Sequence, residues 1–273
     1  MDKLSRLVNI VVKAIIFIGV IPMMLPLVWM ILMSLSSRGD MVTDSLLWLP
    51  NPIKWSNYPE SLKVLPFHLF YKNTILLSVF STVGAVFSTS LVAYGFARFQ
   101  FPGREIIFIV MLSTIMLPGV VLMIPSFVLF RYLGWLDTLK PLIIPNFLAL
   151  APGAVFLFRQ QMRKIPGDTI DAAKLDGCGP IRIYFQIVLP HCLPIIGIVS
   201  IMHFIASWND LMGPLIYLNT MEKKTVSLGL TFFRNQYANE AGLMMAASII
   251  AMIPLIIIFI FTQKQIVKGG KAF

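Results

Sequence analysis

The side chains best suited to chemistry in this 273-residue sequence are three neighbours, Trp208, Asn209 and Asp210. A ring, an amide and a carboxylate suit a sugar, because its hydroxyl groups need hydrogen-bond partners and its C–H faces pack on rings. Consecutive helical residues point about 100° apart, so the three cannot line one pocket. A structural role is the alternative: Asn209 or Asp210 bonds to a partner chain or caps the helix break before Gly213-Pro214. Both interpretations are open at this point.

Sequence patterns for enzyme chemistry are absent. His68, His191 and His203 are scattered, and no H-E-x-x-H motif or catalytic spacing of Ser and Asp occurs. No G-x-x-x-x-G-K-[ST] motif is present to hold the phosphates of ATP. We therefore predict no catalytic residue, no metal site and no cofactor bound by this chain, and an enzyme embedded in the membrane is disfavoured.

The second candidate site is a short polar helix within the loop 163–189. Pro166 ends the segment before it, Asp168 is the predicted N-cap residue, and Asp171 three residues later makes a pair resembling a capping box. Gly177 suits the position just after the helix.

Such a helix has only two to three turns and is marginally stable by itself in water, so another surface must hold it. The small side chains of Ala172 and Ala173 would let the groove of another protein approach closely. Alternatively, the helix lies on the surface of this protein. The residues alone favour neither docking on another protein nor packing on this one.

The elements that position these residues are apolar helices. Hydrophobic residues make up 58% of the chain, charged residues only 12%, and the mean hydropathy is +0.83. A soluble domain has about 25% charged residues, so the composition indicates a membrane protein. Six charge-free runs are 18 to 27 residues long, and a membrane helix needs about 20 apolar residues. They are 14–37, 73–97, 106–130, 141–158, 183–209 and 241–263.

We predict an all-α integral membrane protein with six transmembrane helices, a short cytoplasmic helix and a single transmembrane domain over residues 1–273. The first apolar run is too long for a signal peptide and is assigned as the first span. The predicted spans are about 12–35, 73–97, 106–130, 141–160, 190–218 and 241–263.

The loop charges predict the orientation. Loops on the side of both termini carry 13 Lys and Arg in 55 residues, whereas the opposite loops carry 9 in 64. The richer side is expected in the cytoplasm, so both termini face inward. Asp210 then lies about 27 Å along the fifth span from Cys192, close to the outer boundary. Cys178 and Cys192 fall near a cytoplasmic loop, and we expect reduced thiols.

The loop also resembles a known family. Asp171-Ala172-Ala173, Asp176-Gly177, Pro190 and Pro194 are similar to the EAA loop of ABC-importer permeases, with Asp171 in place of the usual Glu and Cys178 in place of Ala. Further segments between residues 70 and 273 look like the carbohydrate-uptake branch, which contains the MalG-like permeases. These segments are YGFARF at 94–99, RYLGWLDT at 131–138, WND at 208–210 and the tail 263–270.

The resemblance implies a permease subunit of an ATP-driven importer in the bacterial plasma membrane. Expected partners are a second homologous permease, an ATPase dimer that uses ATP and Mg²⁺, an extracellular solute-binding protein and membrane lipid, but no nucleic acid. The substrate would be a sugar, oligosaccharide or related polyol, and in some relatives the partner permease supplies most sugar contacts. The implied ATPase-coupling residues are Asp168, Asp171, Ala172, Ala173, Asp176, Gly177 and Pro190.

The outer loop 219–240 resembles the family's loop that reaches into the binding protein, and Asn235, Gln236 and Tyr237 are the implied contacts. An ion-coupled secondary transporter is the alternative function. It usually needs buried ionisable relays and internal repeats, and this sequence has one acid within a span and no visible repeat.

Overall fold

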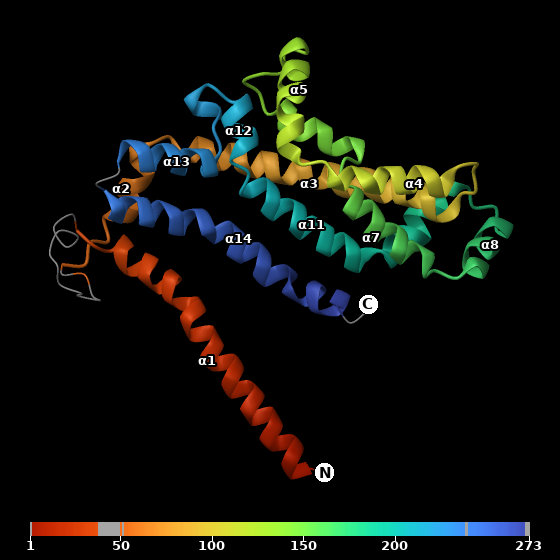
Figure 1. Ribbon diagram of the computed structural model, residues 1–273, viewed down its shortest axis with the longest axis horizontal. Helices are drawn as coiled ribbons and strands as arrows, with labels where there is room; N and C mark the ends of the chain where they lie inside the picture. Colours follow the sequence, from red (N-terminus) through yellow and green to blue (C-terminus); the bar gives the residue numbers. More distant parts are fainter. Residues whose placement is uncertain (1, 38–49, 51, 238–239, 271–273) are drawn as a thin grey trace. The chain divides into compact units, whose positions relative to one another are not determined.

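The computed structural model describes residues 2–37, 50, 52–237 and 240–270, and this part of the chain contains helices and no β-strand (Figure 1). The all-helical prediction is thereby confirmed. The long helices are α1 (Asp2–Ser34), α3 (Phe67–Arg98), α4 (Arg104–Ser113), α5 (Gly119–Tyr132), α7 (Pro152–Arg163), α11 (Leu193–Trp208), α13 (Val226–Gln236) and α14 (Ala241–Gly270). The short ones are α2 (Asn57–Val64), η2 (Thr114–Met116), α6 (Lys140–Ile143), η3 (Ile144–Leu148), α8 (Gly167–Leu175), α9 (Pro180–Ile183), η4 (Tyr184–Val188), α10 (Leu189–His191), α12 (Met212–Tyr217) and η5 (Met221–Lys223).

Four helical segments in the described residues are long and apolar enough to cross a membrane, or up to six if each of two bent pairs is one span. The four are Ile10–Ser34, Phe67–Arg98, Lys140–Arg163 and Ala241–Gln263. The bent pairs are Arg104–Met116 with Gly119–Tyr132, and Pro180–His191 with Leu193–Trp208.

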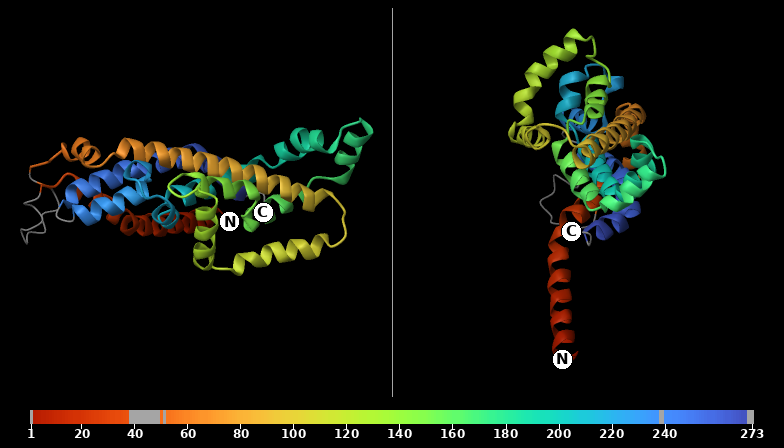
Figure 2. Two further views of the ribbon diagram at one scale, coloured as in Figure 1. Left: turned by 90° about the horizontal axis from the view of Figure 1, so that it is seen from above. Right: turned by 90° about the vertical axis from the view of Figure 1, so that its right-hand side faces the viewer.

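The predicted third span, 106–130, is two helices that meet at 98° (Figure 2). Pro118 explains the bend, because its ring removes a backbone donor and forces the preceding residue out of the helical region. Leu117 and Pro118 both have extended backbones. The predicted fifth span, 190–218, is likewise interrupted at Cys192 and again after Trp208.

The chain packs as two compact units, and the first comprises residues 1–67 and 229–253. Asn57 joins its helices, because Nδ2 donates to the carbonyl oxygens of Ser34 (2.8 Å) and Ser36 (3.0 Å) at the end of α1. Gly242 approaches the same place, where a Cβ atom would lie 2.8 Å from the carbonyl oxygen of Ser36. The carbonyl oxygens at the end of α1 are therefore satisfied by the Asn57 amide, and they leave no space for a side chain at position 242.

The second unit comprises residues 68–228 and 254–273. Its core joins α3, α4, α7 and residues 183–199 through Phe96, Phe108, Val155, Phe158, Met162, Tyr184, Val188 and Val199. Polar side chains of α3 also bond to the backbone of the next layer: Ser81 Oγ donates to Leu142 (3.1 Å) and Ser88 Oγ to a carbonyl of η3 (2.9 Å). Between them Gly84 allows close contact, because a Cβ there would lie 2.5 Å from the Phe147 ring.

Candidate functional site

The short helix α8 exists, but it begins differently from the prediction. Its first residue is Gly167 and Pro166 is the N-cap residue, with no side-chain capping bond. The predicted N-cap role of Asp168 is therefore wrong, because the N-cap residue is Pro166, two positions earlier, and Asp168 already lies inside the helix. Asp171 forms an ion pair with Lys174 (2.7 Å) in place of a capping box.

The end of α8 follows the prediction. Gly177 has φ +78°, the left-handed conformation expected just after a helix. Its N–H donates to the Lys174 carbonyl (3.0 Å), and the Cys178 N–H donates to the Ala173 carbonyl (2.9 Å). These two bonds are the Schellman pattern, which satisfies the last carbonyls of the helix. A glycine is needed here because an L side chain is strained at this φ.

Most of the predicted coupling residues lie together on the exposed side of α8. Asp168, Asp171, Ala172, Asp176 and Gly177 are all exposed. Ala173 is 7% exposed and packs into the core, and Pro190 lies apart from α8 in α10. At the end of the helix Leu175 is 89% exposed. The exposed Leu175 side chain and the carboxylates near it form a surface suited to a partner that offers an apolar contact and positive charge.

Sequence reasoning missed the side chains of α3 that hold both ends of the loop around α8. Arg98 Nη2 donates to the Ile165 carbonyl (2.8 Å), and also bonds to the Met162 carbonyl before α8. Tyr94 Oη donates to the Pro180 carbonyl after α8 (3.1 Å). One turn earlier on α3, Ser90 Oγ lies 2.8 Å from Tyr184 Oη.

Ser90, Tyr94 and Arg98 are spaced four residues apart and therefore share one face of α3. Polar residues at this spacing in an otherwise apolar segment were the available signal in the sequence. This α3 clamp, as we call the three side chains, connects a long helix to both ends of the α8 loop.

The structure separates the three residues of the predicted sugar-binding group. Trp208 is 2% exposed, with ring contacts to Tyr71 (6.3 Å) and Phe204 (5.6 Å). Asn209 is exposed and donates back to the carbonyl of residue 205 (3.0 Å). Asp210 is half-buried, and its Oδ1 accepts the N–H of Gly213 (3.1 Å). Asp210 thus has the predicted structural role at the helix break.

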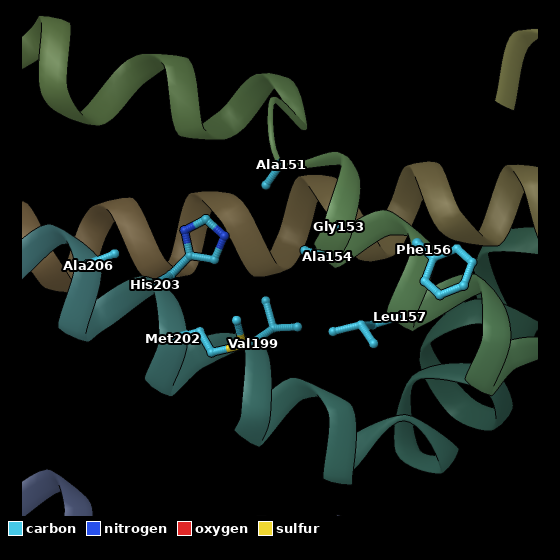
Figure 3. A pocket seen from close by; sticks show the side chains of 9 residues that line it. All are labelled: Ala151, Gly153, Ala154, Phe156, Leu157, Val199, Met202, His203 and Ala206. Atoms are coloured by element: carbon cyan, nitrogen blue, oxygen red, sulfur yellow. The ribbon is translucent and has the colours of Figure 1, made fainter. Parts of the chain in front are cut away.

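Asp210 also lines a pocket of about 290 Å³, which we call the polar pocket. Its lining residues come from α3, α6, η3, α11 and the break after α11: Leu77, Ser81, Leu142, Asn146, His203, Ala206, Ser207 and Asp210. A neighbouring apolar pocket of about 480 Å³ shares His203 and Ala206 with it. In the apolar pocket these two residues lie at one end and Phe156 and Leu157 of α7 at the other (Figure 3).

Two of the predicted binding-protein contacts, Asn235 and Gln236, fall in a helix, α13, and Tyr237 directly follows it. Asn235 is exposed in its last turn. Tyr237 is half-buried and its ring lies 5.2 Å from the Phe233 ring. The side chain of Gln236 lies outside the described part of the structure.

Asp137 anchors the connection between α5 and α6, and sequence reasoning missed it. Its carboxylate accepts the N–H groups of Asn219 (3.0 Å) and Thr220 (2.9 Å) and forms an ion pair with Lys223 (2.8 Å). Lys223 and Thr220 hold the pKa of Asp137 well below its usual range, because they stabilise the charged form. Its backbone has φ +57°, which Asp and Asn tolerate better than most residues.

Comparison with known proteins shows a consistent relationship. Residues 85–269 match the family model described as binding-protein-dependent transport system inner membrane component. The arabinooligosaccharides transport system permease protein AraQ of Bacillus subtilis (strain 168) is 36% identical over 73% of this chain and 70% of its own. The lactose transport system permease protein LacG of Rhizobium radiobacter is 27% identical over 97% of this chain and 95% of its own.

Solved structures share the fold. A chain of a bacterial ABC transporter involved in the import of the acidic polysaccharide alginate superimposes with a TM-score of 0.82 at 23% identity, covering 97% of this chain and 98% of that one. A chain of an alginate ABC transporter in complex with an alginate pentasaccharide-bound periplasmic protein gives a TM-score of 0.67 at 14% identity, covering 96% of both.

Proposed function

This chain belongs to the family of binding-protein-dependent transport system inner membrane components, and from this we propose that it carries a sugar, oligosaccharide or related polyol across the bacterial plasma membrane. It is a multi-pass permease subunit and not an enzyme, and ATP hydrolysis belongs to a separate subunit. The relatives' names support the substrate class, since they include permeases for arabinooligosaccharides, lactose and diacetylchitobiose.

The proposed complex contains a second homologous permease, an ATPase dimer that binds ATP and Mg²⁺, and an extracellular solute-binding protein. Six spans with both termini in the cytoplasm place α8 on the ATPase side and Asn235, Gln236 and Tyr237 on the binding-protein side. This chain binds neither a cofactor nor nucleic acid in this proposal. ATP binding closes the ATPase dimer, and α8 transmits the movement to the spans.

The observation that carries the proposal is the exposed side of α8, which matches the family's coupling motif. Asp168, Asp171, Ala172, Asp176 and Gly177 dock on the ATPase. Ala173 supports the helix from the core side, and Pro190 belongs to the segment that returns to the membrane. Asp210 lines the substrate pathway beside its capping role, whereas Trp208 and Asn209 are not among the residues that line the polar pocket.

Substitution of Ala172 tests docking directly. Ala172→Arg places a large cation on the exposed side of α8 without disturbing the core, because Ala172 is exposed. We expect the ATPase subunit to be lost on purification and sugar-stimulated ATP hydrolysis to fall by about tenfold or more. The conservative Ala172→Ser variant is the matched control and should resemble the wild type. Normal co-purification and transport by Ala172→Arg would contradict the docking role.

A further inference from the structure

We propose that the polar pocket is a sugar-binding site in this subunit, taking one ring of the substrate, with His203 as its central hydrogen-bonding group. The proposal rests on the function proposed above and adds a location for the ligand: the space between α3, η3 and α11. It also gives a role to His203, which the sequence alone does not connect with any other candidate residue.

The polar residues of α11 and its end share one face. His203, Ser207 and Asp210 follow the spacing i, i+4 and i+7, so they lie above one another in a helix that is otherwise almost entirely apolar. The opposite wall supplies Ser81 of α3 and Asn146 of η3. Five polar side chains therefore meet at one pocket in a membrane segment, where an ionisable residue is by default a candidate for function.

Several of these groups have hydrogen-bonding capacity to spare. Within the described chain, neither His203 nor Ser207 makes a hydrogen bond through its side chain. Asn146 uses its Nδ2 to bond to the Leu142 carbonyl (2.8 Å), which leaves its carbonyl oxygen for a ligand. Polar groups removed from water need partners. A sugar ring, which has several hydroxyl groups that both donate and accept, can supply them.

The position of His203 along α11 favours a polar solute over a lipid. It lies ten residues after Leu193 at the start of the helix, which is about 15 Å and half the thickness of a bilayer core. A lipid headgroup lies at the membrane surface and would not reach that depth. The pocket volume of about 290 Å³ is also suited to a compact ring and not to an extended chain.

The apolar pocket supplies the other half of sugar recognition. His203 and Ala206 line both pockets, so a ring bound at His203 lies next to the apolar surface that begins with Met202 and Val199 (Figure 3). A pyranose or furanose ring has hydroxyl edges and C–H faces, and the two pockets match these two surfaces.

Transport kinetics test the site. The complex is reconstituted with its binding protein and assayed with arabinotriose, lactose and diacetylchitobiose, which represent the relatives' carbohydrates. For the sugar that is transported, His203→Ala should raise the KM for transport by about tenfold, and His203→Gln should restore part of the affinity because its amide can hydrogen-bond. ATP hydrolysis without sugar is measured in parallel, and in Ile205→Ala both this rate and the KM should match the wild type. Ile205→Ala, on the opposite face of α11, is the matched control.

An unchanged KM in His203→Ala would overturn the proposal, and so would a loss of transport that His203→Gln does not relieve while ATP hydrolysis also falls.

A measurement that needs no known substrate separates failure of the site from failure of the proposed function. In a Cys178→Ala background, a charged thiol reagent in water should label Ser207→Cys much faster than Ile205→Cys. Buried Cys192 is retained, and its labelling in the parent gives the background. Equal labelling of the two positions would show that the pocket does not admit polar solutes.

Discussion

Asp137 is the residue at which one side chain fixes two distant segments. Its carboxylate holds the backbone of residues 219 and 220 and the ammonium group of Lys223. The depressed pKa means that the folded protein binds a proton there less readily than the unfolded chain. The stabilisation is therefore fully present above the unfolded pKa of about 4 and is lost as the pH falls below it.

The Asp137→Asn variant should unfold at a lower temperature than the wild type at pH 7 in detergent, and the difference should shrink as the pH falls from 5 to 3. Asn tolerates the same backbone conformation and keeps one acceptor oxygen, so the change isolates the charge. Lys140→Met, which removes a nearby exposed cation, is the control. An equal difference in unfolding temperature at pH 7 and pH 3 would show that the ion pair with Lys223 contributes nothing.

At the scale of elements, the α3 clamp connects a membrane helix to the segment that docks. Arg98 bonds to carbonyl oxygens before α8 and Tyr94 to one after it, so α8 and α3 are expected to move together. Hydrogen bonds to charged groups contribute about 1.5–3 kcal/mol each, which makes Arg98 the strongest part of the clamp.

Arg98→Met should uncouple the transporter. We expect ATP hydrolysis to continue while the number of sugar molecules carried per ATP falls by about fivefold. Arg98→Lys keeps the charge and should recover part of the loss, whereas Tyr94→Phe should have a smaller effect. Transport and hydrolysis are measured on the same proteoliposomes. If both rates fall in parallel in Arg98→Met, its role is assembly and not coupling.

The predictability of the elements follows from what their sequences contain. Residues 73–97 of α3 and the start of the last helix at 241 were predictable, because long charge-free runs define them, whereas the first turns of α3 from Phe67 lie outside such a run. The predicted third span, 106–130, is interrupted at Pro118, and the charge-free run alone does not give the 98° size of that bend. Gly177 was predictable from local chemistry alone. The polar pocket was not, because residues 81, 146 and 203 meet only through packing between helices.

At the scale of the whole molecule, charge distribution sets the expected orientation. The loops beside α8 and the termini are richer in Lys and Arg than the opposite loops, which predicts that α8 lies in the cytoplasm. This orientation is a prediction from the loop charges. Two exposed positions, Arg163 before α8 and Asn219 in the opposite loop, allow it to be tested.

In intact cells, a thiol reagent that cannot cross the membrane should label Asn219→Cys and leave Arg163→Cys unlabelled until the cells are permeabilised. A Cys178→Ala background removes the partly exposed native thiol, and the parent without an added cysteine is the control. Labelling of Arg163→Cys from outside would invert the orientation and rule out docking of α8 on a cytoplasmic ATPase.

The contact of Gly242 with the end of α1 has a consequence for the order of synthesis. Ser36 emerges from the ribosome some two hundred residues before Gly242, and the first unit is complete only when both are present. Most of the second unit, residues 68–228, is made in the interval and can fold first. The N-terminal helix α1 is therefore expected to lie in the membrane without its contact to Gly242 until α14 has been synthesised and inserted.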